Sequence, residues 1–123
     1  MATSHIAHRT SHVASALCVI LARAGSKGLP NKNVLEINGR PMVQWTVCHA
    51  RDAQQRGVID HVIVSTDGKA IAQAARDAGA EVLMRPAALA GDTASVADAA
   101  RHALNNIRPP TSHIPDVIIL YRN

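Results

Sequence analysis

The stretch "ALCVILARAGSKGLPNKN", residues 16–33, joins an apolar run to a loop rich in cations and glycine. Residues 16–22 are apolar without interruption, which is typical of a strand that is buried on both faces. Residues 23–33 then supply three cations, two glycines, one proline and no acid. Open α/β sheets bind their ligands beyond the carboxyl ends of the strands. The stretch therefore predicts an α/β fold with an anion site directly after its first strand.

The rest of the chain alternates between helical and extended patterns. A short extended piece over 34–41 turns at Asn38-Gly39. Further strands are predicted at 61–65, 80–84 and 116–121. Helices are predicted from Pro41 to about Arg56, from about 69 to 78, and after a cap at Asp92 or Thr93. This alternation predicts a Rossmann-like, three-layer α/β fold with a parallel sheet.

The helix ends and helix faces are predicted from the same patterns. Gly57 and Gly79 suit helix ends, and Asp67 suits the cap of the second helix. The apolar face of that helix comprises Ile71, Ala74, Ala75 and Ala78. The third helix is expected to turn inward Val96, Ala100, Ala103, Leu104 and Ile107. Because many of these side chains are alanines, which bury little surface each, we expect a marginally stable chain.

The charge distribution favours a local anion site. The formal net charge is +4, no acidic residue precedes Glu36, and the whole excess lies in residues 1–35. A general basic surface would spread its charge more widely. The only aromatic residues are Trp45 and Tyr121, so no platform for stacking bases is present and no nucleic-acid partner is expected. No apolar run approaches the length of a membrane span, so no membrane partner is expected either.

The cysteines and the N-terminus suggest a cytoplasmic protein. Cys18 in the first strand and Cys48 in the first helix are interpreted as core residues in a reducing compartment, and their spacing matches no zinc site. Residues 1–14 are predicted to be a disordered extension. Two other interpretations of this end are disfavoured: a secretory signal running from Arg9, and a metal site made by three histidines.

The loop has the chemical groups of a phosphate site without a standard phosphate-binding pattern. The spacing of Gly25 and Gly28 fits neither the Walker loop nor the dinucleotide fingerprint. The two glycines still allow backbone N–H groups to approach an anion, and Ser26 and Asn33 can donate hydrogen bonds. The cations Arg23, Lys27 and Lys32 can balance about three or four negative charges, the load of a nucleoside triphosphate. The alternative is a solvated turn with scattered cations.

The same residues resemble the signature of acylneuraminate cytidylyltransferases, (I/L)-x-A-R-x-G-S-K-G-(I/L)-x-x-K-N. The segment "LARAGSKGLPNKN" meets every fixed position of this signature. Weaker matches follow in the right order: "NGRPMVQWTV", "VIVSTDGKAIAQAARDAGAEV" and "RPAALAGDTAS". The resemblance covers about residues 17–121. The related Kdo cytidylyltransferases carry an S-T-R-L-P-G-K-type loop, so the acylneuraminate branch is favoured.

The resemblance implies a fold of the nucleotide-diphospho-sugar transferase type and a reaction. In that reaction CTP and a nine-carbon 2-keto sugar acid give a CMP-sugar and pyrophosphate, with Mg²⁺ as cofactor. It assigns Arg23, Lys32 and Asn33 to the β- and γ-phosphates, with Arg23 and Lys32 as the catalytic groups. Gly25, Ser26 and Lys27 line the same cradle.

The resemblance also implies a base site. The backbone of Leu21 and Ala22 reads the cytosine, and Arg85 and the backbone of Ala94 complete the site. Val96 lies nearby, where the family often has serine. For Arg85 the alternative is an exposed residue before Pro86. For Asp67 we favour a helix cap over a metal ligand.

Two departures lead to the expectation that residues 15–123 are the N-terminal part of a cytidylyltransferase domain. The chain reads "LYRN" where the family continues L-Q-P-T-S-P-L-R, and family members are longer. The Mg²⁺ ligands, the sugar pocket and the contacts of a homodimer are expected outside this chain, so it should show no turnover alone. The alternative function is a non-catalytic nucleotide-binding module. An oxidoreductase is disfavoured because the dinucleotide fingerprint is missing.

Overall fold

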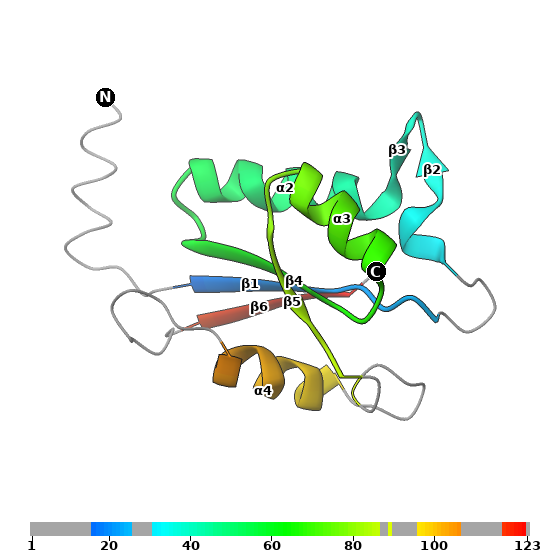
Figure 1. Cartoon of the computed structure of the whole chain (residues 1–123). Coiled ribbons are helices and arrows are strands. Elements are labelled where there is room, and N and C mark those ends of the chain that lie inside the picture. The colour runs from blue at the N-terminus through cyan, green and yellow to red at the C-terminus, as the bar shows by residue number, and fades with distance from the viewer. Residues whose placement is uncertain (1–15, 26–30, 87–88, 90–95, 107–116, 123) are drawn as a thin grey trace.

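The computed structural model describes residues 16–25, 31–86, 89, 96–106 and 117–122. Four strands form one parallel sheet, β1 (Ala16–Leu21), β4 (His61–Thr66), β5 (Glu81–Met84) and β6 (Val117–Arg122). The order across the sheet is β5-β4-β1-β6. Helices α2 (Met42–Gln55) and α3 (Lys69–Asp77) lie on one face, and α4 (Val96–Asn106) lies on the other (Figure 1). The predicted three-layer α/β fold is confirmed.

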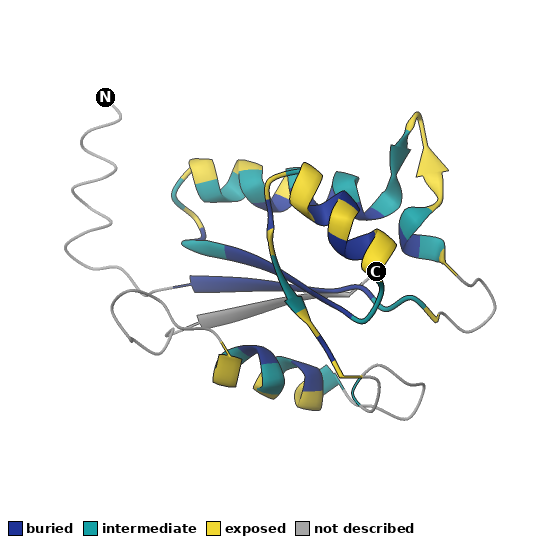
Figure 2. Cartoon of the chain, viewed as in Figure 1, coloured by how far each residue is buried: buried dark blue, intermediate teal, exposed yellow. Residues whose placement is uncertain are grey.

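Strand β1 is the centre of the core, because both of its faces are covered. All six of its residues are buried, which agrees with its uninterrupted apolar sequence (Figure 2). Cys18 and Ile20 face the α2–α3 layer, and burial raises the pKa of the Cys18 thiol. Leu17 and Val19 belong to the core on the α4 side. The register pairs Leu17 with His61 and with Ile118, so β1 is held by a neighbour on each edge.

The two helical layers differ slightly from the predicted faces. On α3, Ile71, Ala74 and Ala75 are buried as predicted, and Ala72 is buried as well. On α4, Ala99 and Ala103 are the buried residues, whereas Ala100 is only half-buried. Val96 and Leu104 pack against the same core as predicted, so the described part of the inward face differs from the prediction only in that Ala99 takes the place of Ala100. Ile107 lies outside the described residues.

The turn and the helix ends lie close to the positions predicted from the sequence. Asn38 and Gly39 have φ of 51° and 83°, which makes the tight turn of a hairpin between β2 (Glu36–Ile37) and β3 (Arg40–Pro41). Gly57 and Gly79 also have positive φ, and each lies just past a helix end. Pro41 was predicted inside the first turn of the helix but lies one residue before it, at the N-cap position.

Two predictions about single residues are wrong. Asp67 does not cap α3: the N-cap is Gly68, no side chain makes a capping hydrogen bond there, and Asp67 bonds to another segment. Cys48 is not a core residue but a half-buried one on α2, and both described cysteines are free. The predicted caps Asp92 and Thr93 and the extension 1–14 fall outside the described residues.

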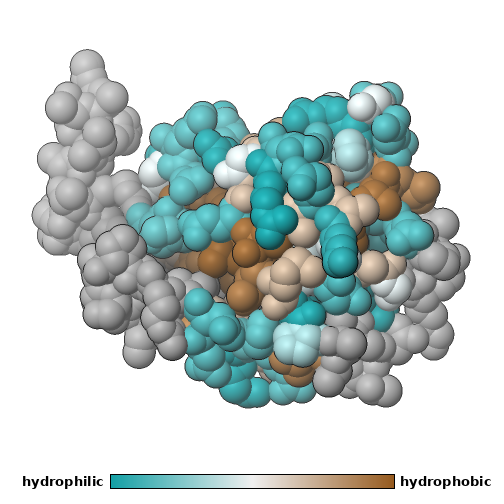
Figure 3. All heavy atoms as spheres, viewed as in Figure 1, coloured by the Kyte–Doolittle hydropathy of each residue, from teal (hydrophilic) through white to brown (hydrophobic). Residues whose placement is uncertain are grey.

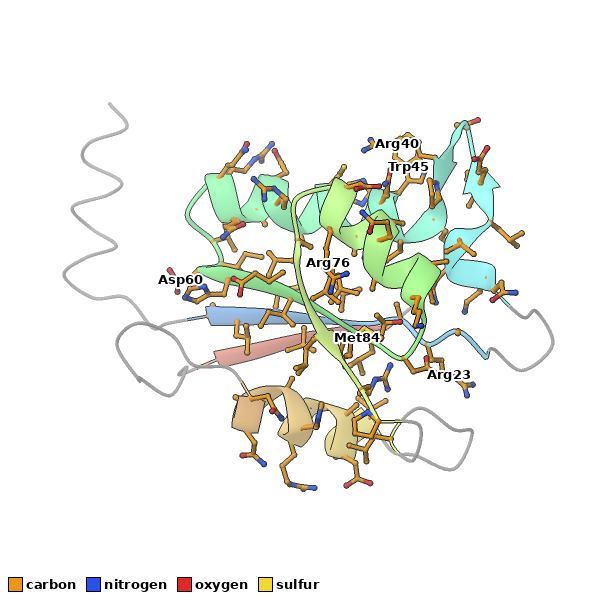
Figure 4. The ribbon with its side chains drawn as sticks, in the orientation of Figure 1. Arg23, Arg40, Trp45, Asp60, Arg76 and Met84 are labelled. Carbon is orange, nitrogen blue, oxygen red and sulfur yellow. The ribbon has the colours of Figure 1, made fainter. Side chains whose placement is uncertain are left out.

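In Figure 3, polar side chains lie mainly above and below an apolar region at the centre of the view. Exposed apolar residues occur at Leu35 and Ile37 near the hairpin, and at Met84 on β5. Beside the hairpin, the Arg40 guanidinium lies 5.3 Å from the ring centroid of Trp45, whose Nε1–H donates to the carbonyl oxygen of Ile37 (Figure 4). In the described part of the chain, no helix is both long and apolar enough to cross a membrane.

Candidate functional site

The carboxyl ends of β1, β4 and β5 meet at one edge of the sheet. The N–H of Ala22, just after β1, donates to the carbonyl oxygen of Ser65 at 3.0 Å. The N–H of Arg85, just after β5, donates to the carbonyl oxygen of Thr66 at 2.7 Å. The sequence segments after all three strands are thereby brought together, as the parallel topology predicts.

The first part of the cationic loop is held through Ala24. Its N–H donates to Oδ1 of Asp67 at 2.8 Å, and its carbonyl oxygen accepts from the N–H of Asn31 at 3.0 Å. Asn31 has φ of 59°, a left-handed conformation that asparagine tolerates better than most residues. The loop therefore leaves β1 and returns at Asn31, where a backbone hydrogen bond joins Asn31 to Ala24.

Asn33 fixes the backbone of Arg23. A 3₁₀ helix, η1 (Lys32–Val34), begins at the return point of the loop, and Asn33 in it is only 2% exposed. The side-chain Nδ2 of Asn33 donates to the carbonyl oxygen of Arg23 at 3.2 Å. The arrangement places Lys32 and Arg23 on neighbouring segments, and Figure 4 shows Arg23 beyond the carboxyl end of β1.

Arg85 is buried, with 8% of its surface exposed. Its Nη1 donates to the carbonyl oxygen of Leu89 at 2.9 Å, and its Nη2 to that of Ser65 at 3.2 Å. Its buried Nε has no hydrogen-bond partner within the described structure. Burial lowers the pKa of Arg85, while the nearby Asp67 carboxylate raises it and the Arg23 cation lowers it. The alternative prediction of an exposed residue before Pro86 is wrong.

The structure brings together most of the predicted site residues that it describes. Ala22, Arg23 and Asn33 are linked by chain and hydrogen bonds, and the charge of Arg23 acts on Arg85. Gly25 is exposed, and a side chain there would meet nothing within 4 Å. Leu21 is buried at the end of β1. Ser26, Lys27, Gly28 and Ala94 lie outside the described residues.

Comparison with known proteins assigns the family. Residues 17–113 match the family model described as cytidylyltransferase. The chain belongs to the cytidylyltransferase family. The family resemblance found in the loop sequence is thus confirmed over most of the chain.

Members of more than one branch of the cytidylyltransferase family are similar to the chain. An N-acylneuraminate cytidylyltransferase from Escherichia coli is 39% identical over 89 residues, which cover 72% of this chain and 20% of that protein. A 3-deoxy-manno-octulosonate cytidylyltransferase from Synechococcus elongatus is 43% identical over 86 residues, covering 70% of this chain and 34% of that protein.

A solved structure gives the same picture. It is described as a CMP:2-keto-3-deoxy-manno-octonic acid synthetase complexed with CTP, and it aligns with a TM-score of 0.69 at 29% identity. The alignment covers 88% of this chain and 39% of that one, so the chain spans well under half of these relatives. Because the sequence identities to members of the two branches are similar, they do not decide to which branch of the cytidylyltransferase family the chain belongs.

The described residues do not offer a complete site for Mg²⁺. No group of three His, Cys, Asp or Glu side chains with the geometry to hold a metal occurs in the described part of this cytidylyltransferase chain. Among the described residues, Asp67 brings a carboxylate to the site, and its Oδ1 already accepts from the N–H of Ala24. We therefore assign no chemical step through a metal to these residues.

Parallel topology predicted that the end of β4 lies at the same edge as the cationic loop, but sequence reasoning missed the contact of Asp67 with that loop. The loop after β1 contacts Ser65 and Asp67, and the segment after β5 contacts Thr66. Gly68 bonds to Thr66 and lies against Ala24. The signal that predicted this edge was the position of these residues at the carboxyl end of a buried parallel strand, where open α/β sheets bind ligands. An aspartate two residues before a helix pattern looked like an ordinary cap, which concealed its contact with Ala24.

Proposed function

We propose that this chain carries the CTP site of an enzyme that transfers CMP from CTP to an acidic 2-keto sugar and releases pyrophosphate. Support comes from the family, from the solved relative described as complexed with CTP, and from the cations at the carboxyl edge. The observation that carries the proposal is the buried Arg85 guanidinium, whose Nε has no hydrogen-bond partner among the described residues and on which the charge of Arg23 acts.

In the proposed base site, Arg85 is the hydrogen-bond donor to cytosine and the carbonyl oxygen of Ala22 is the acceptor. Cytosine offers an exocyclic amino donor, and it has acceptors on its ring nitrogen and carbonyl. Arg85 supplies N–H donors for those acceptors. Since the N–H of Ala22 already donates to Ser65, Ala22 is proposed to read the amino group through its carbonyl oxygen. Leu21 and the backbone of Ala94 complete this proposed site.

The proposed phosphate site uses the loop and η1. Arg23 and Lys32 bind the β- and γ-phosphates, and Asn33 holds the Arg23 backbone in addition to any contact of its own with phosphate. The exposed backbone at Gly25, together with Ser26 and Lys27, forms the rest of the cradle. A guanidinium can bind two phosphate oxygens at once, which makes Arg23 the strongest single contact.

The proposed reaction is an in-line displacement at the α-phosphorus. The anomeric hydroxyl of the sugar acid forms the new P–O bond, its proton is lost, and the bond to pyrophosphate breaks. Arg23 and Lys32 neutralise the charge that develops on the departing pyrophosphate. When bound, Mg²⁺ would supply further charge neutralisation. We propose a nine-carbon acceptor, because the loop has the acylneuraminate form of the motif.

The expected result of a nucleotide competition follows from the base site. CTP should displace a bound fluorescent cytidine nucleotide from the 123-residue chain at far lower concentration than ATP or GTP. Purines present different donor and acceptor patterns to Arg85 and Ala22, and a missing hydrogen bond in a buried polar site costs about 1–3 kcal/mol. Displacement titrations at one salt concentration measure this. Equal displacement by all three triphosphates would overturn the cytidine assignment.

A further inference from the structure

We propose that Asp67 is the positioning residue of the CTP site: it holds the cationic loop through the N–H of Ala24. This inference rests on the proposed function, since it assigns a residue to the phosphate site. The contact joins residues 43 positions apart in sequence and is short, with 2.8 Å between Ala24 N and Asp67 Oδ1. A hydrogen bond to a charged acceptor is stronger than one between neutral groups.

The neighbours of Asp67 support the same segment of the loop. A side-chain carbon at Gly68 would lie 3.0 Å from Cβ of Ala24, so the absence of a side chain allows the loop to approach the start of α3. The N–H of Gly68 donates to Oγ1 of the fully buried Thr66 at 3.1 Å, which fixes the turn that carries Asp67. Residues 66–68 thus form the surface on which Ala24 is held, and Arg23 directly precedes Ala24 in the loop.

Two other roles for Asp67 are less consistent with the structure. It does not cap α3, because no side chain makes a capping hydrogen bond at that helix start. It does not belong to a three-ligand metal cluster within the described residues.

The negative charge of Asp67 allows its positioning role to be separated from an effect of charge. A carboxylate beside an anion site repels phosphate, so on charge alone its removal should tighten CTP binding. A positioning role predicts a split between two substitutions. Asp67→Asn keeps an oxygen that can accept from Ala24 and removes the charge, whereas Asp67→Ala removes both.

The experiment compares the unmodified chain with Asp67→Asn, Asp67→Ala and Asp77→Ala. Asp77 is an exposed carboxylate at the other end of α3 whose side chain bonds to Gln73, so its replacement gives the same change in net charge away from the site. CTP and CMP affinities are measured by calorimetry. Exchange of the Ala24 amide is followed by NMR and needs no nucleotide.

We expect Asp67→Ala to weaken CTP binding on the order of tenfold and CMP binding much less, because CMP lacks the outer phosphates. Asp67→Asn and Asp77→Ala should bind CTP within about threefold of the unmodified chain. Exchange of the Ala24 amide should rise on the order of tenfold in Asp67→Ala alone. Equal CTP affinity in Asp67→Ala and Asp67→Asn, or unchanged exchange at Ala24, would overturn the inference.

A second variant keeps the test decisive if Asp67→Ala does not fold. Gly68→Ala retains the carboxylate but crowds Ala24, and it should also weaken CTP binding more than CMP binding. Unchanged CTP binding in Gly68→Ala would contradict the claim that residues 66–68 hold Ala24 in place for CTP binding. An unmodified chain that binds no CTP would instead overturn the proposed function, and the exchange data would still report whether Asp67 holds the loop.

Discussion

Replacing Arg23 by alanine is expected to weaken CTP binding by roughly 10- to 150-fold, which corresponds to a lost charge-assisted contact of about 1.5–3 kcal/mol. Asn33 fixes the backbone of Arg23, and Asp67 fixes that of Ala24, so the Arg23 side chain is attached to a fixed backbone. A fixed backbone lowers the entropy lost when the guanidinium binds phosphate. CMP binding should change far less, because CMP has no β- or γ-phosphate.

Two control variants give this prediction its specificity. Arg101→Ala removes the same charge from the surface of α4, where Arg101 pairs with Asp98, and should leave CTP binding nearly unchanged. Lys27→Ala should weaken CTP binding less than Arg23→Ala does, because an ammonium cannot make the paired contacts of a guanidinium. Isothermal titration with CTP and CMP measures all three variants. Equal weakening of CTP and CMP by Arg23→Ala would remove Arg23 from the outer phosphates.

Replacing Ile71 by alanine is expected to lower the free energy of unfolding by about 2–5 kcal/mol. Ile71 is 1% exposed, and the other buried residues of α3 are alanines, so this one side chain supplies most of the apolar contact of the helix. A small domain is stable by only about 5–15 kcal/mol, so the variant should be close to unfolding.

The matched control for Ile71 is Val58→Ala. Val58 is 61% exposed, and truncating it should change the free energy of unfolding by less than about 0.5 kcal/mol. Urea denaturation followed by circular dichroism measures both. A similar loss in the two variants would mean that the α2–α3 layer does not depend on Ile71.

Much of the fold was predictable because its signals are local. The uninterrupted apolar run of β1 indicated a central strand, and the structure buries all six residues from Ala16 to Leu21. Asn38-Gly39 predicted a tight turn, and Gly57 and Gly79 predicted helix ends, because each position needs a positive φ. Parallel topology then placed the segments after β1, β4 and β5 at one edge.

The parts that were not predicted depend on contacts between distant segments. Asp67 has the sequence context of a helix cap, and only the packing of Ala24 against the start of α3 shows that its carboxylate bonds to the loop. Arg85 precedes a proline and carries a charge, which usually indicates exposure, yet carbonyl oxygens of Ser65 and Leu89 allow its burial. On α4, Ala99 rather than Ala100 is the buried residue, because two adjacent alanines give no signal in the sequence for which of them faces the core.

A map of amide chemical shifts in the isotope-labelled chain as CTP is added would locate the CTP site most directly. We expect the largest shifts at Ala22 to Gly25, at Lys32 and Asn33, and at Arg85, with smaller ones at residues 66–68. CMP should reproduce the shifts at Ala22 and Arg85 and reduce those at Lys32 and Asn33. Saturable shifts centred on another surface, such as the β2–β3 hairpin around Trp45, would contradict the assignment of the CTP site.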